Sequence, residues 1–279
     1  MLKTAKRTIV IFGLAALASG CRGIAHQATH TPEISHLRLM ATTSSAPLAR
    51  DLIQSYVRED SLFIISLSEA NWSAVQKQVN EDPAFFGMTM FLPDASTLWA
   101  TPIGEDGLAI IVHPALKLNA LTAPQLRTIF SGSVRNWREV GGPDLPIVVV
   151  SREAGADTRS VFERLVMGER PISGTAVLAP SSSSVLNIVS ATEGAISYAS
   201  FGSLDNRVAV VPIAGSAADT PITPSLPTII DRSYPLRMPI LIVSQREPQP
   251  DTPVYEFFVW VQQGSGQNIV RQRYAPLNP

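Results

Sequence analysis

The chain has 279 residues, and its 22 Lys and Arg residues against 23 Asp and Glu residues give a net charge of −1. This balance excludes recognition of nucleic acid or of an anionic membrane surface by bulk charge. A hydrophobic fraction of 45% can build a sizeable core, which excludes a disordered chain, and the single cysteine excludes an intrachain disulfide and a thiolate metal cluster.

The start of the chain has the pattern of an export signal. A basic start precedes ten largely apolar residues (8–17), and small residues precede Cys21, the only cysteine. Ten such residues are too few to span a bilayer. We predict a lipoprotein signal peptide over 1–20, lipidation of Cys21 and a tether over 21–35. An ordinary cleaved signal is the alternative, because Ala18 stands where the usual lipoprotein box has Leu.

Short apolar runs, each followed by polar residues and then by helical periodicity, recur along the chain. The runs cover 36–40, 62–66, 108–113 and 147–151. Apolar residues at helical spacing follow the first run over 48–57 and the fourth over 161–166. This alternation predicts an α/β fold, with amphipathic helices that cover a sheet. In open α/β sheets the ligand lies beyond the carboxyl ends of the strands, so the loops that begin these helices form the candidate site.

The first of these loops, 41–47, holds four consecutive hydroxyl residues before Pro47, which suits a first helical turn. A helix N-terminus has unpaired N–H groups and a partial positive charge, and hydroxyls beside it can complete a cage for an anion. The alternative is simple N-capping. One hydroxyl suffices for a cap, so the run favours ligand contacts by Thr43, Ser44 and Ser45.

The second loop, 151–159, again lies between a predicted strand and a helix. Gly155 permits a close backbone approach, Asp157 or Thr158 can cap the helix, and Arg152 or Arg159 can supply a charged fork for an anion. The alternative for the two arginines is pairing with neighbouring carboxylates: Glu153, Asp157 or Glu163.

A series of separate motifs resembles the substrate-binding protein of the bacterial phosphate ABC importer. They lie in the same order and at the same spacing, at 102–114, 121–122, 125–126, 129–132, 136–137, 139–142, 151–153, 194–198, 234–236 and 239. With the first loop the resemblance covers 36–279. It implies a periplasmic-binding-protein type II fold, in which two α/β lobes joined by crossing strands hold the ligand between them. We place lobe 1 at 36–108 and 209–279 and lobe 2 at 109–208.

The resemblance weakens where the ligand would lie. The family commonly has Ser and Gly where this chain has Ala156 and Asp157, and Met90 stands where the family has a polar or acidic residue. The family's other Gly/Ser-rich loop is absent, and Ser68 is one of the few possible substitutes. Asp157 either accepts a hydrogen bond from a protonated ligand or turns outward, caps the helix and leaves the backbone N–H groups to the anion. A third reading is that the ligand is not phosphate.

We predict an extracytoplasmic, lipid-anchored solute-binding protein that captures a small oxyanion, phosphate first, and delivers it to the transmembrane subunits of an ABC permease. We expect a monomer without catalysis, cofactor, metal or nucleic-acid partner, since no nucleophile with a base and no metal-ligand spacing is present. The alternative is a related lipoprotein with a degraded anion site that binds another small molecule or acts as a sensor or adhesin. The predicted ligand-binding residues are Thr43, Ser44, Ser45, Ser68, Arg152, Gly155, Ala156, Asp157 and Thr158.

Overall fold

The computed structural model describes residues 35–59 and 63–278, which belong to one compact unit. The predicted signal peptide, Cys21 and nearly all of the predicted tether lie outside the described residues. Within the described ranges no helix combines the length and the hydropathy that a membrane span requires.

The described elements alternate between strands and helices for most of the chain. The strands are β1 (Ser35–Thr42), β2 (Phe63–Ala70), β3 (Phe85–Thr89), β4 (Trp99–Val112), β5 (Leu121–Thr122), β6 (Val148–Arg152), β7 (Val177–Ala179), β8 (Ala195–Ser200), β9 (Ala209–Val210), β10 (Ile213–Ala214) and β11 (Arg237–Ser244). The α-helices are α1 (Ala46–Glu59), α2 (Trp72–Glu81), α3 (Ala123–Phe130), α4 (Asp157–Phe162), α5 (Ser182–Ala191), α6 (Leu226–Ile230), α7 (Pro253–Gln262) and α8 (Gly264–Val270). Short helical turns are η1 (Trp137–Val140), η2 (Glu163–Met167) and η3 (Phe201–Ser203).

The main sheet has the strand order β2-β1-β3-β11-β4-β8-β6-β7, with β9 paired to β4, and β5 pairs with β10 in a separate small sheet. Strands β2, β1 and β3 are parallel, as are β8, β6 and β7, whereas β11 and β4 run antiparallel to their neighbours. Parallel neighbours need a crossover connection, and the helices α1, α2, α4 and α5 lie in these connections.

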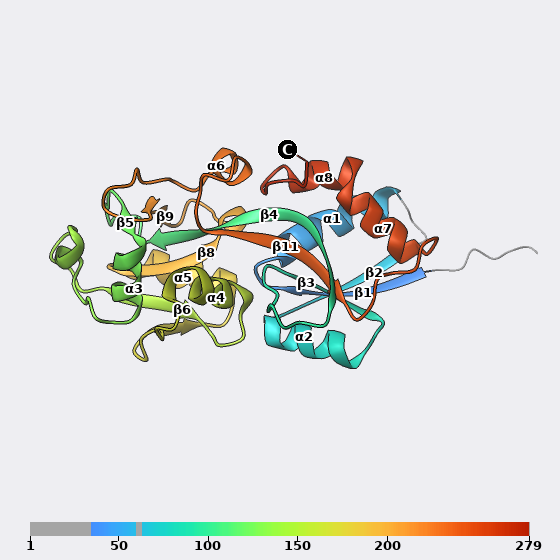
Figure 1. Cartoon of the computed structure of the whole chain (residues 1–279), viewed down its shortest axis with the longest axis horizontal. Helices are drawn as coiled ribbons and strands as arrows, with labels where there is room; N and C mark the ends of the chain where they lie inside the picture. Colours follow the sequence, from blue (N-terminus) through green and yellow to red (C-terminus); the bar gives the residue numbers. More distant parts are fainter. Residues whose placement is uncertain (1–34, 60–62, 279) are drawn as a thin grey trace, which may run out of the picture. The chain divides into compact units, whose positions relative to one another are not determined.

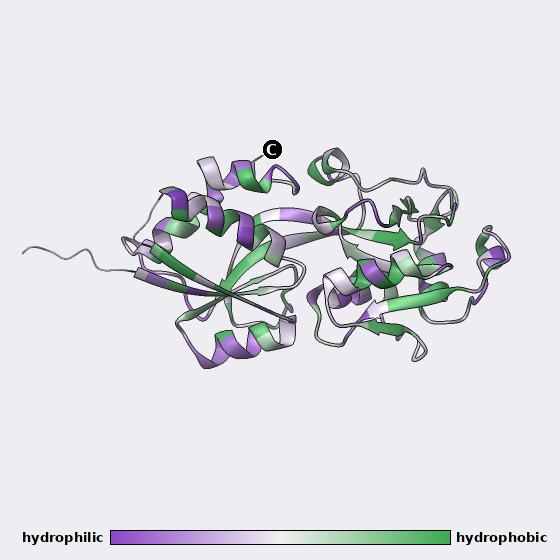
Figure 2. Cartoon of the chain, turned by 180° about the vertical axis from the view of Figure 1, so that it is seen from behind, coloured by the Kyte–Doolittle hydropathy of each residue, from purple (hydrophilic) through white to green (hydrophobic). Residues whose placement is uncertain are grey.

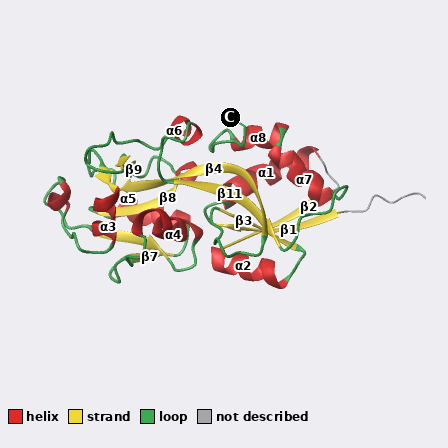
Figure 3. Cartoon of the chain, viewed as in Figure 1, coloured by secondary structure: helices red, strands yellow, loops and turns green. Residues whose placement is uncertain are grey.

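Alternation along the strands distributes the core over both faces of the sheet. In β1, Leu37 and Leu39 belong to the large core cluster that includes α1 residues, while Met40 packs against the cluster of Trp72, Val75 and Val79 from α2. Helices therefore cover both faces (Figures 1 and 3). They carry hydrophilic as well as hydrophobic residues, as amphipathic helices on a sheet should (Figure 2).

Strand β4 is the longest strand and connects the two parallel groups. Its residues from Trp99 to Gly107 pair with β11, and those from Leu108 to Val112 pair with β8. The chain passes from the first group to the second through β4 and returns through β11, and the two strands lie side by side (Figure 1). The predicted boundary after residue 108 falls inside β4, and the lobe boundaries stay a prediction.

The predicted βα units are present. The apolar runs at 36–40, 62–66 and 147–151 lie in or overlap β1, β2 and β6, and each of these three strands precedes a helix. The run at 108–113 forms the second part of β4, which is followed by β5 before α3. The carboxyl ends of β1 and β6 therefore lead into the two loops that the sequence marks as the candidate site.

Candidate functional site

The loop between β1 and α1 is held by its own hydroxyl groups. The N–H of Ser45 donates to the carbonyl of Thr42 at 3.0 Å, and the Ser45 hydroxyl donates to the carbonyl of Met88 in β3 at 2.8 Å. The Thr42 hydroxyl lies 2.9 Å from that of Ser45. The side chains of Thr42, Ser44 and Ser45 are buried, and that of Thr43 is only half-buried. This arrangement fixes two hydroxyls, Thr42 and Ser44, on the inner side of the loop.

The loop between β6 and α4 turns at Gly155, whose φ of +87° is a left-handed conformation that glycine adopts without strain. Ala156 is the N-cap residue of α4 and has no side-chain hydroxyl with which to cap it. Oδ1 of Asp157 instead accepts the N–H of Thr158 at 2.7 Å. Asp157 is 1% exposed, so its other carboxylate oxygen also needs donors.

Those donors come from the first loop and from the residue that follows β3. The hydroxyls of Thr42 and Ser44 each donate to Oδ2 of Asp157 at 2.6 Å, and the N–H of Met90 donates to the same oxygen at 3.1 Å. We call these four residues the carboxylate cluster. A buried negative oxygen with three donors is the kind of coordination that oxyanion sites provide. The cluster thus joins the two loops that the sequence predicts to converge.

Asp157 therefore faces inward. The outward orientation considered from the sequence is wrong, because the carboxylate enters the hydroxyl loop and uses only one oxygen for its own helix. Met90 contributes its backbone N–H, although its side chain replaces the polar or acidic residue of the family. A carboxylate is present at the site, supplied by the second loop.

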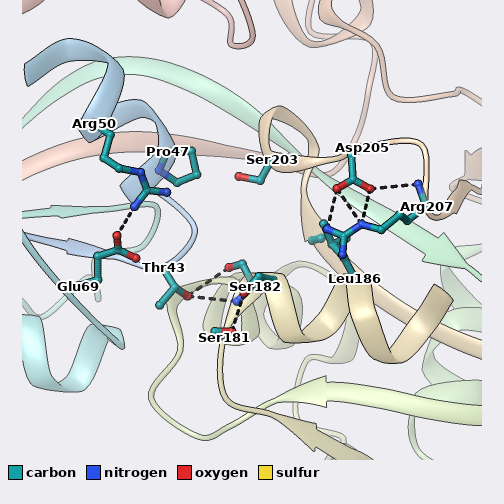
Figure 4. Close-up of a pocket in the computed structure, with 12 residues that line it drawn as sticks. Thr43, Pro47, Arg50, Glu69, Ser181, Ser182, Leu186, Ser203, Asp205 and Arg207 are labelled. Atoms are coloured by element: carbon teal, nitrogen blue, oxygen red, sulfur yellow. Dashed lines mark hydrogen bonds and ion pairs between the residues drawn. The ribbon is translucent and has the colours of Figure 1, made fainter. Parts of the chain in front are cut away.

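A pocket of about 200 Å³ lies beside the cluster, between the first loop and the start of α5. On its wall the hydroxyls of Thr43 and Ser182 are 3.2 Å apart, and the N–H of Ser182 lies 3.4 Å from the Thr43 hydroxyl (Figure 4). Ligand pockets for drug-sized molecules measure roughly 300–1,000 Å³. The smaller volume here favours a small ligand.

The mouth of the pocket carries two ion pairs of opposite charges. Arg50 pairs with Glu69, and Arg207 pairs with Asp205 (Figure 4). The side-chain hydrogen bond from Arg207 lowers the pKa of Asp205, and the charge of Arg207 contributes to the same shift. Each arginine is thus balanced by its own carboxylate, which leaves the mouth without a large net field.

Both arginines of the second loop bind neighbouring carboxylates. The guanidinium of Arg152, which is 1% exposed, donates from Nε to Glu153 at 2.9 Å and to the carbonyl of Ala179 at 3.1 Å, and from Nη2 to Glu153 at 2.9 Å. Its Nη1 donates to the Ser182 hydroxyl at 3.3 Å. Arg159 pairs with Glu163 at 2.8 Å. Both arginines therefore form the carboxylate pairs that the sequence offered as the alternative to anion binding. Arg152 contacts the wall of the pocket through its hydrogen bond to Ser182.

The predicted ligand-binding residues fall into three groups. Ser44 and Asp157 belong to the carboxylate cluster, and Ser45, Gly155, Ala156 and Thr158 shape its two loops. Thr43 and Arg152 meet at Ser182, on the wall of the pocket. Ser68 lies exposed on β2, and among the described contacts none joins it to the cluster. The ligand-binding role of all these residues stays a prediction.

Three groups at the site were not predicted from the sequence: the hydroxyls of Thr42 and Ser182 and the N–H of Met90. Thr42 was within the four-hydroxyl loop, so that signal was available for it. Ser182 lies in a serine run at 181–184 whose position opposite Thr43 depends on the fold. The N–H of Met90 is a backbone donor, for which no residue type gives a signal. Elsewhere in the described residues, no group of three or more His, Cys, Asp or Glu side chains is placed to hold a metal ion.

Comparison with known proteins identifies similar chains. A family model described as the PBP superfamily domain matches residues 26–262. The phosphate-binding protein PstS of Bacillus subtilis is 30% identical over 145 residues, 51% of this chain and 46% of that protein. PstS of Borreliella burgdorferi is 25% identical over 180 residues, 62% of this chain and 63% of that protein. The chain therefore aligns with less than two thirds of the length of either relative.

Two solved structures match a larger part of the chain. A candidate phosphate ABC transporter substrate-binding protein from Clostridium perfringens, solved with bound phosphate, has a TM-score of 0.78 and 26% identity and covers 87% of this chain and 99% of its own. An ABC-type phosphate transport receptor from Vibrio cholerae has a TM-score of 0.70 and 27% identity, with 86% and 99% covered. The expected fold of two α/β lobes joined by crossing strands is confirmed by these matches and by the sheet order.

Proposed function

Because this chain belongs to the PBP superfamily, we propose that it is an extracytoplasmic solute-binding protein that captures a small oxyanion, with inorganic phosphate as the first candidate. The ligand is held between two lobes and released to the transmembrane subunits of an ABC permease. Binding and release require closure and opening of the lobes and no covalent step.

The observation that carries this proposal is the coordination of the Asp157 carboxylate. Two buried hydroxyls and one backbone N–H, from Thr42, Ser44 and Met90, are aimed at a single negative oxygen. Buried anions are tolerated only where hydrogen-bond donors replace the lost water, so donors preorganised in this way suit an oxyanion. The same donors would bind phosphate in place of the carboxylate.

The similar proteins support the choice of phosphate. Those described above are phosphate-binding or phosphate-transport proteins by name, and one was solved with phosphate bound. Association with a permease and anchoring through Cys21 are parts of the same proposal. The small volume of the pocket agrees with capture of a small solute.

Titration of the full chain, purified in mild detergent, with phosphate, arsenate, sulfate and molybdate tests the proposal by calorimetry. We expect saturable heat with phosphate, and with arsenate because it has the same shape and protonation. Thermal stabilisation should rise with the logarithm of the phosphate concentration above the dissociation constant. If none of the four anions gives heat or thermal stabilisation, capture of an oxyanion is rejected and binding of another small molecule takes its place.

A hydroxyl variant locates the binding. Thr42→Val keeps the shape of the side chain and removes one donor, and a hydrogen bond to a charged group is worth roughly 1.5–3 kcal/mol. On an Asp157→Ala background, in which no carboxylate shares this hydroxyl, we therefore expect the phosphate dissociation constant to rise by at least about tenfold. Thr175→Val, which removes an exposed hydroxyl bonded to Ser173, is the control and should leave it unchanged. Equal affinities of the two variants would place the ligand elsewhere.

A further inference from the structure

The carboxylate of Asp157 has the coordination of a bound ligand. Oδ2 accepts from Thr42, Ser44 and the N–H of Met90, and Oδ1 accepts from the N–H of Thr158. We propose that Asp157 is a tethered anion: with the lobes closed, its carboxylate takes the place of the free oxyanion and competes with it. This inference rests on the proposed function and concerns the same site.

The donors and the carboxylate come from different parts of the sheet. Thr42 ends β1, Ser44 follows it and Met90 follows β3. Both strands belong to the group that β11 borders, whereas Asp157 begins α4 after β6 in the other group. The bonds from Thr42 and Ser44 join residues 115 and 113 positions apart. An opening between the groups would therefore withdraw the carboxylate and leave its donors accessible.

Two further contacts each join one of these loops to the opposite group of strands and helices. The N–H of Ser73, at the start of α2, donates to the carbonyl of Gly155 at 3.1 Å. The hydroxyl of Ser203 donates to the carbonyl of Ser44 at 3.3 Å. These are neutral and are available to a closed protein with or without Asp157 in the cluster. The charged acceptor is thus the component that a free anion can replace.

The shared donors make the two anions competitors. Among the described residues no arginine or lysine lies within ion-pair distance of Asp157, since Arg152 binds Glu153 and Arg159 binds Glu163. All of its hydrogen-bond donors are hydroxyls and backbone N–H groups. A second anion would need the neutral donors that Oδ2 already uses, and without a proton to donate to the carboxylate it would also meet electrostatic repulsion in a buried site.

Competition of this kind weakens binding without removing the site. The apparent dissociation constant equals the intrinsic one divided by the fraction of molecules whose donors are free. A resting state closed by its own carboxylate keeps that fraction small. The chain would then bind phosphate only at concentrations that are high for its intrinsic affinity, and Asp157 would set that threshold.

The test is a phosphate titration of the full chain and three variants. Asp157→Ala removes the carboxylate and places a good helix former at the first residue of α4, and Asp157→Asn keeps its shape without the charge. Asp144→Ala is the matched control, because it removes an exposed carboxylate, bound to Arg138, that lies outside the pocket and the carboxylate cluster. We expect the dissociation constant to fall at least about tenfold in Asp157→Ala, to fall less in Asp157→Asn and to change less than about threefold in Asp144→Ala.

Each outcome separates the inference from the proposed function. A native chain that binds phosphate while Asp157→Ala and Asp157→Asn bind it equally or more weakly overturns the tethered anion and leaves the function standing. Binding by the variants alone supports the tethered anion and rejects phosphate capture by the native chain. If none of the four proteins binds phosphate, both the tethered anion and the proposed function are overturned. Thermal melts of each variant establish that it is folded before it is titrated.

Discussion

Asp106 is a buried acid outside the carboxylate cluster, on the strand that connects the two groups. Its Oδ1 accepts the N–H of Gly107 at 2.7 Å and of Gly202 at 3.1 Å, and the Ser200 hydroxyl donates to Oδ2. Burial raises the pKa of Asp106 from 3.8 to about 7, although these hydrogen bonds and the charge of Arg273 lower it. The desolvation of the charged form outweighs its hydrogen bonds.

The raised pKa predicts a fall in stability with rising pH. The folded protein holds the proton more tightly than the unfolded chain, so this contribution is full below pH 3.8 and is lost as the pH rises through about 7. Each pKa unit is worth about 1.4 kcal/mol, so the loss attributable to Asp106 is about 2 to 3 kcal/mol between pH 5 and pH 8.

Asp106→Asn should remove that part of the pH dependence. The amide can donate to Ser200 and accept from Gly107 and Gly202, so the packing is kept. Urea unfolding at pH 5 and pH 8 measures the difference, and Asp94→Asn, whose side chain is 98% exposed, is the control. A slope against pH that is the same in Asp106→Asn and the native chain would contradict the pKa assignment.

At the scale of elements, the approach of the β6–α4 loop to α2 depends on Gly155. A Cβ at this position would lie 2.3 Å from the Ser73 hydroxyl and 3.0 Å from its Cβ, and the φ of +87° is unfavourable for any L residue with a side chain. Gly155 accepts the N–H of Ser73, so it cannot move away without losing that bond. The turn thus fixes where Asp157 enters the first loop.

Gly155→Ala should therefore lower the free energy of unfolding more than the same change at a glycine whose surroundings are open. Gly141 is that control, because its φ is +86° and a Cβ added there would have no neighbour within 4 Å. We expect both variants to lose about 1 kcal/mol through the backbone, and Gly155→Ala to lose roughly 1 to 3 kcal/mol more through the clash. Chemical denaturation measures both, and equal losses would show that the loop moves without cost.

At the scale of the whole molecule, stability and binding rest on different parts of the fold. A cluster of aromatic side chains, which we call the aromatic group, joins α1, β2 and α7. The ring centroid of Phe257 lies 4.9 Å from that of Tyr56, 6.1 Å from that of Phe63 and 6.2 Å from that of Trp260. Tyr56 comes ten residues after the start of α1, which is about 15 Å along the helix axis from the hydroxyl loop. The aromatic group stabilises the fold without touching the carboxylate cluster.

Phe257→Ala should separate the two properties. Truncation of a buried phenylalanine costs about 3–5 kcal/mol, because it loses apolar burial and leaves a cavity. We expect a lower melting temperature with a phosphate dissociation constant within about twofold of the native value at 15 °C. Phe85→Ala, at a half-buried ring, should cost less stability. A large change in phosphate affinity with Phe257→Ala would show that the two regions are coupled.

Local pattern was sufficient for the elements and for the loops that carry the site. Apolar runs predicted the positions of β1, β2 and β6, since a strand or helix must turn its apolar side chains toward a core and this leaves a period in the sequence. The order and spacing of the motifs resembled one family, and that resemblance implied the two-lobe fold. The hydroxyl run predicted ligand contacts by the loop after β1, which stay a prediction, and Ser44 of that run lies in the carboxylate cluster.

The pairing of side chains was decided only by the tertiary structure. A strand period says which face a residue shares but nothing about a partner more than 100 positions away, so the sequence could not decide that Asp157 turns inward to Thr42 and Ser44, or that Arg152 binds Glu153. Ser68 was chosen for its hydroxyl, and its place on β2 leaves it exposed. Thus the sequence by itself determined the fold and the polar loops, whereas packing between distant segments decided which donors meet the carboxylate, because that choice depends on burial and distance in three dimensions.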